Sequence, residues 1–134
     1  MICGFTDGIL IMIKLMVCGS RGITDEQFVF NAIDEYVAEL NDDVIIIEGE
    51  ARGVDSIAKK WALTHNKQIM SFPAQWDLYG KSAGFRRNYD MVKACDYCLV
   101  LWDGQSKGTK HDIDLCVQWN KPYKVVRNNH SQGK

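Results

Sequence analysis

The chain has little proline, almost no net charge and no long apolar run, and each shortage excludes a class of protein. Only 2 of its 134 residues are proline and it holds no low-complexity tract, which excludes a disordered linker. A formal net charge of −1 gives no general attraction to nucleic acid or to an anionic membrane. The apolar patch at residues 9–13 is too short to span a membrane and lacks the layout of a signal peptide. The sequence therefore predicts a folded cytoplasmic protein with no membrane partner, for which nucleic acid is an unlikely partner and any anion site is local.

The five cysteines are an odd number, which argues against a disulfide framework and fits reduced thiols. Cys95 and Cys98 have the C-x2-C spacing of a metal or redox motif. A tetrahedral zinc site needs four ligands, however, and the sequence holds neither a second such pair nor a nearby pair of histidines. Cys98 also lies in the apolar run YCLVLW. The sequence therefore predicts buried structural thiols, with no metal site and no cofactor.

Short apolar runs alternate with helical patterns along the chain. The runs predict five strands, at residues 13–18, 44–47, 68–72, 97–102 and 123–126. This alternation predicts an α/β fold, a Rossmann-like three-layer αβα sandwich around a five-stranded parallel sheet of order 3-2-1-4-5. We expect this single domain to span residues 13–127, after an N-terminal extension at 1–12 and before a polar tail at 128–134.

Four segments have apolar residues at helical spacing. The first begins with a capping box formed by Thr24 and Gln27. The second follows the glycine turn that starts at Gly49. The third and fourth are expected to bury apolar residues against the sheet: Phe85, Tyr89 and Val92 in the third, and Ile113, Cys116 and Val117 in the fourth.

Three glycine-bearing turns follow predicted strands, at residues 19–22, 49–53 and 104–108. Because the carboxyl ends of parallel strands meet at one edge of a sheet, these turns should converge there, and the crevice between the turns after the first and fourth strands is the expected ligand site. Helix N-termini and arginine side chains both suit an anion. The connections also carry several cations, so the sequence favours a phosphate-bearing ligand.

With these residues assembled, the chain resembles the SLOG superfamily of Rossmann-like proteins, in particular a group of small bacterial and phage proteins. The matching segments are GSRGITD (19–25), EGEARGVDSIAKKWA (48–62), FPAQWDLYGKSAGFRRN (72–88) and SKGT (106–109). Glu50 departs from the group, which usually has a second glycine there, and its carboxylate would either point to solvent or bind a ribose hydroxyl. Superfamily members often dimerise, so the resemblance implies a possible homodimer.

Two relatives within the superfamily imply different functions. The ARGVD segment resembles DNA-processing protein A, which binds single-stranded DNA. The run that starts at Arg87 and the turn that ends at Asp112 resemble motifs of the Lonely Guy phosphoribohydrolases, which split the N-glycosidic bond of nucleoside 5′-monophosphates with an arginine and a glutamate. Here Asn88 replaces the family's lysine, and Asp112 is one methylene shorter than the glutamate.

Our first hypothesis is a binding module that holds a nucleotide or nucleotide-derived ligand, as a sensor could do. The residues expected to contact the ligand are Gly19, Ser20, Arg21, Gly49, Glu50, Arg52, Gly53, Asp55, Lys81, Asn88, Gly108 and Thr109. The alternative is a phosphoribohydrolase-like N-glycosidase with Arg87 and Asp112 as catalytic residues. Two simpler interpretations stay open: Asp112 could complete a capping box with Thr109, and Asp55 could only complement a helix dipole. Binding of single-stranded DNA is less expected, because the chain lacks an extended basic track.

Overall fold

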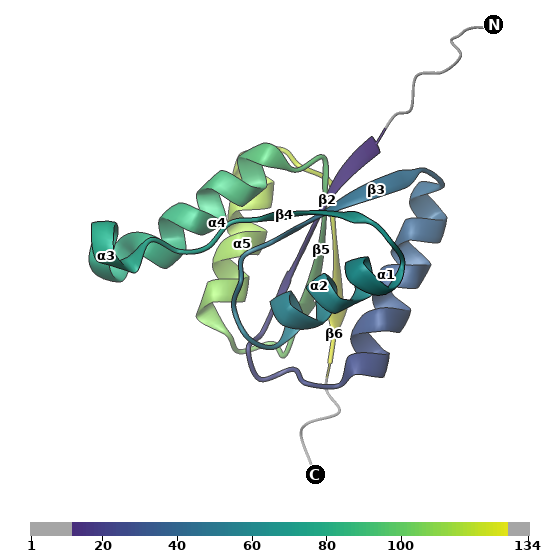
Figure 1. The fold of residues 1–134 in the computed structure, drawn as a ribbon. Helices are drawn as coiled ribbons and strands as arrows, with labels where there is room; N and C mark the ends of the chain where they lie inside the picture. Colours follow the sequence, from purple (N-terminus) through teal and green to yellow (C-terminus); the bar gives the residue numbers. More distant parts are fainter. Residues whose placement is uncertain (1–11, 129–134) are drawn as a thin grey trace, which may run out of the picture.

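Strand β2 (Met12–Gly19) is the centre of a five-stranded sheet in the computed structural model, which describes residues 12–128 (Figure 1). β3 (Asp43–Glu48) and β4 (Gln68–Ser71) lie on one side of β2, and β5 (Tyr97–Trp102) and β6 (Tyr123–Arg127) lie on the other. Every neighbouring pair is parallel, and the order β4-β3-β2-β5-β6 confirms the predicted order.

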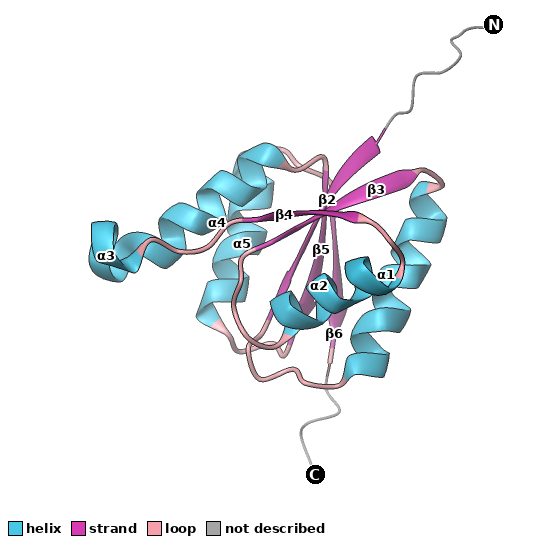
Figure 2. Cartoon of the chain, in the orientation of Figure 1, coloured by secondary structure: helices cyan, strands magenta, loops and turns pink. Residues whose placement is uncertain are grey.

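Helices cover both faces of the sheet, as the alternating pattern predicts (Figure 2). α1 (Glu26–Leu40) and α2 (Val54–Thr64) pack on one face, and α4 (Ala83–Ala94) and α5 (Lys107–Gln118) pack on the other. Successive residues of β2 point to opposite faces, so Leu15 joins the α1–α2 core and Met16 joins the α4–α5 core. Both side chains are fully buried.

The segment between β4 and α4 is longer than a turn because it contains two short helices of its own. α3 (Trp76–Tyr79) and the 3₁₀ helix η1 (Gly80–Ser82) continue α4 beyond the body of the molecule, and we call this projection the arm (Figure 1). The arm has no fully buried side chain. Its apolar side chains Trp76 and Leu78 are 52% and 66% exposed.

Three expectations about the helices were wrong in detail. The N-cap of α1 is Asp25, not Thr24, because the Asp25 carboxylate accepts the Phe28 N–H at 3.1 Å. Phe85 and Tyr89 do not face the core. They lie on the outer side of α4, where the Phe85 ring meets His111 of α5 and the Tyr89 ring meets Trp119, the residue that follows α5. Val117 is 62% exposed, and Leu115 takes the buried position on α5 instead.

Among residues 12–128, no helix combines the length and the apolar character that crossing a bilayer requires. The expected extension and polar tail lie almost entirely outside the described residues, which begin at Met12 and end at Asn128.

Candidate functional site

A cavity of about 370 Å³ opens at the carboxyl edge of the sheet, between the turns that follow β2 and β5. This is where the strand order reverses, and it is the place in an open parallel sheet where ligands bind. α4 and the first turns of α5 form the wall opposite the turn after β2. Its lining residues are Cys18, Gly19, Ser20, Arg21, Gly22, Ala51, Asp55, Arg87, Asn88, Met91, Asp103, Ser106, Gly108, Thr109 and Asp112.

The two turns that flank the cavity are joined by polar contacts. The buried Ser20 hydroxyl accepts the Asp103 N–H at 3.1 Å, and the Ser20 N–H donates to the Leu101 carbonyl at 3.0 Å. Asp103 in turn accepts two N–H bonds at 2.8 Å from Gln105 and Ser106. Gly19 is required here, since a Cβ would stand 2.2 Å from the Leu101 carbonyl oxygen. The mouth of the cavity is therefore held in place before any ligand arrives.

Asp112 contributes a buried carboxyl group to the cavity. The residue is 5% exposed, and its Oδ1 atom has no hydrogen-bond partner within residues 12–128. Burial raises the pKa of Asp112 to about 7, with the Asp55 carboxylate adding to the rise and the Cys18 thiol and Arg87 opposing it. Asp112 does not cap α5, because Ser106 is the N-cap and accepts the Thr109 N–H. A buried polar atom without a partner calls for a ligand or water.

Asp55 has a different environment although it lines the same cavity. One carboxylate oxygen accepts the Gly49 N–H at 3.1 Å and the Ala51 N–H at 3.2 Å, which closes the turn after β3. Burial raises the pKa of Asp55 to about 6; the Ala51 N–H lowers it and the Glu48 carboxylate raises it. These contacts give Asp55 a structural role beyond the favourable interaction with the α2 dipole that the sequence indicates.

Arg87 is held by two contacts that fix the direction of its guanidinium. Nη1 donates to the Gly49 carbonyl, and Nε donates to the Asn88 side-chain oxygen at 2.9 Å. The half-buried side chain lines the cavity together with Asn88, which is itself 7% exposed. A planar guanidinium that is oriented in this way retains N–H groups for a phosphate or carboxylate.

The structure brings nine of the predicted residues to the cavity wall and leaves the others away from it. The nine are Gly19, Ser20, Arg21, Asp55, Asn88, Gly108, Thr109 and the two catalytic candidates Arg87 and Asp112. Gly49 lies outside the cavity wall and acts through its backbone, since its carbonyl accepts from Arg87 and its N–H donates to Asp55. Gly53 adopts φ +76° against the Arg21 backbone, so its role is to bring two turns together.

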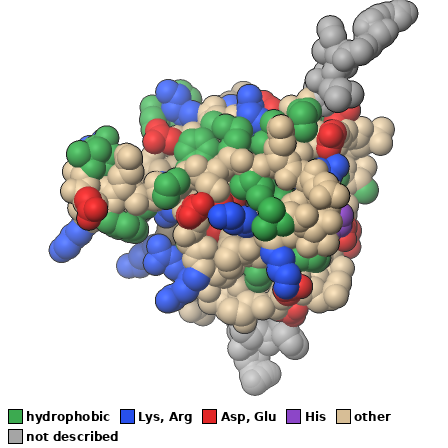
Figure 3. Space-filling view, in the orientation of Figure 1, with side chains coloured by type: hydrophobic (Ala, Val, Ile, Leu, Met, Phe, Trp, Pro, Cys, Tyr) green, Lys and Arg blue, Asp and Glu red, His purple; other side chains and the backbone are tan. Residues whose placement is uncertain are grey.

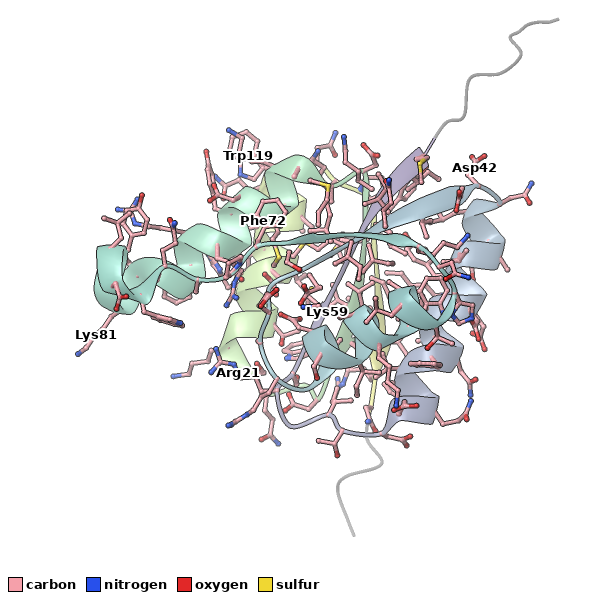
Figure 4. All side chains as sticks on the ribbon, in the orientation of Figure 1. Arg21, Asp42, Lys59, Phe72, Lys81 and Trp119 are labelled. Atoms are coloured by element: carbon pink, nitrogen blue, oxygen red, sulfur yellow. The ribbon has the colours of Figure 1, made fainter. Side chains whose placement is uncertain are left out.

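Glu50, Arg52 and Lys81 do not line the cavity. Glu50 is exposed and forms an ion pair with Lys59 at 3.3 Å, so its carboxylate lies at the surface. Arg52 is exposed beyond the turn. Lys81 was expected to contact the ligand, but it lies on the arm, and Figure 4 shows it pointing away from the body and from Arg21.

Several lining residues were not among the sequence-based candidates. Cys18 and Met91 form an apolar part of the wall, and nothing in their sequence context separates them from ordinary core residues. Ser106 and Asp103 could have been found, because Asp103 directly follows a strand and Ser106 stands three residues before Thr109, as an N-cap does. The four described cysteines are free and buried, and residues 12–128 contain no group of three or more potential metal ligands.

Comparison with known proteins now places the chain. A model of the YspA, cpYpsA-related SLOG family matches residues 13–79. The Gene 61 protein of Mycobacterium phage D29 is 33% identical over 106 residues, which cover 75% of this chain and 85% of that protein. The chain belongs to the YspA, cpYpsA-related SLOG family. The SLOG match ends at residue 79, so Arg87 and Asp112 lie in the part of the cavity that the family model does not cover.

Two solved structures share the SLOG fold of this chain. DNA processing protein A from Streptococcus pneumoniae superposes with a TM-score of 0.70 at 14% identity, over 90% of this chain and 52% of that protein. The Helicobacter pylori protein of the same name, whose structure concerns its binding of single-stranded DNA, gives a TM-score of 0.65 at 21% identity, over 91% of this chain and 68% of that protein. The chain thus spans about half the length of the Streptococcus protein, and the likeness shows the fold.

Proposed function

We propose that the cavity binds a nucleotide or nucleotide-derived ligand. The observation that carries the proposal is the buried Oδ1 of Asp112, which has no partner among residues 12–128 and lies in the same cavity as an arginine already oriented by Gly49 and Asn88. A nucleotide offers a phosphate for the arginine and the open start of α5, and sugar hydroxyl groups for a buried carboxyl. The pairing of one cation with one buried carboxyl therefore matches the two polar parts of a nucleotide.

Titration calorimetry with a panel of nucleoside 5′-monophosphates tests this function. Arg87→Ala should weaken binding of the best ligand about tenfold or more, because the phosphate loses a charge-assisted pair. Arg52→Ala is the matched control, since it removes the same charge from the adjacent turn outside the cavity and should leave affinity unchanged. Equal losses in both variants, or no binding by the parent protein, would refute the proposed site.

A second candidate function is hydrolysis of the ligand, and the environment of Asp112 favours it. A carboxyl with a pKa of about 7 can exchange a proton near neutral pH, as a general acid or base must. In this reaction a nucleoside 5′-monophosphate and water give ribose 5-phosphate and the free base. Positive charge develops on the sugar as the bond breaks, and an ionised Asp112 would stabilise it.

Release of free base, followed by chromatography, separates the two candidates. Asp112→Asn should lower the rate about a hundredfold or more while the ligand still binds. Asp114→Asn is the control on the same helix, because Asp114 is exposed and pairs with Lys110. No base release by the parent protein would leave binding as the function, and equal rates in parent and Asp112→Asn would exclude this mechanism.

Single-stranded DNA is a further candidate ligand, which we infer only from the likeness of fold to DNA processing protein A. The net charge of −1 gives the chain no general attraction to a nucleic-acid backbone. A gel-shift series at low salt tests this ligand: a complex that weakens steeply with added salt would support it, and no complex would exclude it.

A further inference from the structure

A second cavity, of about 560 Å³, lies where the arm meets the outer sides of α4 and α5. Three aromatic rings line it: Tyr79 from the arm, and Phe85 and Tyr89 from α4. They are 39%, 55% and 37% exposed, although each is large enough to serve in the core. The sequence predicts Phe85 and Tyr89 as core residues, and the structure instead places them where a ligand could reach them.

Cationic and polar groups accompany these rings. The Arg86 guanidinium lies 4.2 Å from the centre of the Tyr79 ring, and its Nε donates to the Ser82 hydroxyl at 3.3 Å. His111 meets Phe85 edge to face, with ring centres 4.6 Å apart. Exposed aromatic faces beside a stacked guanidinium suit a nucleotide. Its base has a π-face that can stack on the rings, and its phosphate can bind the guanidinium. Figure 3 shows lysine and arginine side chains on the part of the body next to the arm.

The two cavities are neighbours, because a residue that lines the first contacts a residue that lines the second. Asn88 lines the first cavity and His111 lines the second, and the Asn88 Nδ2 atom lies 3.4 Å from His111 Nδ1. Consecutive arginines of α4 divide between them, since Arg87 lines the first and Arg86 the second. At the start of α5, a Cβ on Gly108 would meet no atom within 4 Å, so the surface beside the first cavity is open.

We propose that the ligand contains two nucleoside units joined through phosphate, with one unit in the first cavity and the base of the other against Phe85 in the second. This inference rests on the proposed nucleotide binding and adds a second subsite to it. The linking phosphate then lies between Arg87, which lines the first cavity, and Arg86, which lines the second. A dinucleotide and the end of a single strand of nucleic acid share this chemistry.

Calorimetry with three adenine ligands tests the second subsite. The ligands are AMP, the 5′-phosphorylated dinucleotide pApA, and two adenosines joined through their 5′ positions by a diphosphate. At least one of the two-base ligands should bind about tenfold more tightly than AMP, as one stacked base allows. A preference for pApA would indicate the end of a strand, and a preference for the diphosphate-linked compound would indicate a free dinucleotide.

Phe85→Ala should bring the ratio of the two-base affinity to the AMP affinity close to one. Leu78→Ala is the matched control, because Leu78 is an exposed apolar residue of the arm outside the second cavity and its loss should leave that ratio unchanged. If AMP binds but neither two-base ligand gains affinity, the second subsite is refuted while nucleotide binding stands. If none of the three ligands binds at the parent protein, both the subsite and binding of adenine nucleotides are refuted.

Discussion

Asp55 and Asp112 are both aspartates that line the same cavity. Their hydrogen bonds differ, and this difference separates a carboxylate that supports the fold from one that is available to a ligand. Both are nine-tenths buried or more, and burial raises the pKa of both. One carboxylate oxygen of Asp55 accepts the N–H groups of Gly49 and Ala51, so Asp55 completes the turn after β3. Asp112 completes no turn and keeps Oδ1 without a partner in the described chain. The first carboxylate is needed by the fold, and the second is available to a ligand.

The same contrast holds for the turns themselves. The N–H groups of the turn after β3 are already hydrogen-bonded to nearby carboxylates. Glu48 accepts the Glu50 N–H at 2.7 Å, and Asp55 accepts two more. It therefore has few donors left for an anion, in spite of its glycines. The turns after β2 and β5 are joined through Ser20 and Asp103, and residues of both turns line the cavity. Glycine content alone does not identify the turn that binds.

Removing Asp55 is the strongest way to break the comparison. Asp55→Ala leaves the Gly49 and Ala51 N–H groups without their acceptor, and we expect the free energy of unfolding in urea to fall by about 2–3 kcal/mol. Asp114→Ala, which removes an exposed aspartate, should change it by less than about 0.5 kcal/mol. If the two variants were equally stable, Asp55 would not have the structural role assigned to it.

The pH dependence of the free energy of unfolding tests the role of Asp112 in this contrast. Its folded pKa of about 7 lies above the ordinary value of 3.8, so the folded protein binds more protons than the unfolded chain between these values. The contribution of Asp112 to the free energy of unfolding is therefore fully present below pH 4 and is lost as pH rises to about 7. The groups that face this carboxyl are Cys18, Asp55 and Arg87.

Asp112→Asn removes this titration and leaves that of Asp55, whose pKa is about 6. Between pH 4 and pH 7 the variant should lose about 3 kcal/mol less stability than the parent protein. Urea unfolding at both pH values measures the difference. The parent and Asp114→Asn should show the same slope, and an identical slope in Asp112→Asn would mean that Asp112 is not titrating in this range.

The smallest expected effect tests whether the turn after β3 is purely structural. Glu50 has φ +61°, a conformation that glycine adopts without strain and other residues adopt at a cost of about 1 kcal/mol. Glu50→Gly should raise the free energy of unfolding by about 0.5 kcal/mol, after loss of the exposed Lys59 pair. Glu50→Ala keeps the strain and loses the pair, so it should be less stable than the parent. A marked fall in nucleotide affinity for Glu50→Gly would instead place this turn at the ligand.

The fold could be predicted closely because its signals are local. Strand β5 begins and ends where the apolar run YCLVLW does, and the strand order follows from alternating elements and right-handed crossovers. The N-cap of α1 lies one residue after the predicted Thr24, because threonine and aspartate are both residue types that N-caps favour and only the hydrogen bond from the Phe28 N–H to Asp25 decides between them. Val117 was misplaced because Leu115 and Cys116 fill the same helical face.

The candidate site could be predicted only where the backbone alone sets it. The switch point of the sheet located the cavity, and the resemblance to the phosphoribohydrolases singled out Arg87 and Asp112. The closed state of the turn after β3 depends on which N–H groups Glu48 and Asp55 accept, and sequence spacing does not show this. The position of Lys81 depends on the helical arm, which composition alone presents as a loop.

The central position of β2 has a consequence for the order in which the molecule assembles. β2 pairs with β3, the next strand in the sequence, but it also contacts β5 and the turn after it across much longer sequence separations. Cys18 and Cys98 are 80 residues apart, and Ser20 and Asp103 are 83 residues apart. Closing so long a loop costs entropy that only the finished pairing repays, so these contacts should form late in folding. The half of the chain that the family model matches cannot enclose the cavity alone. A bound ligand therefore reports that the last long-range pairing of the sheet is complete.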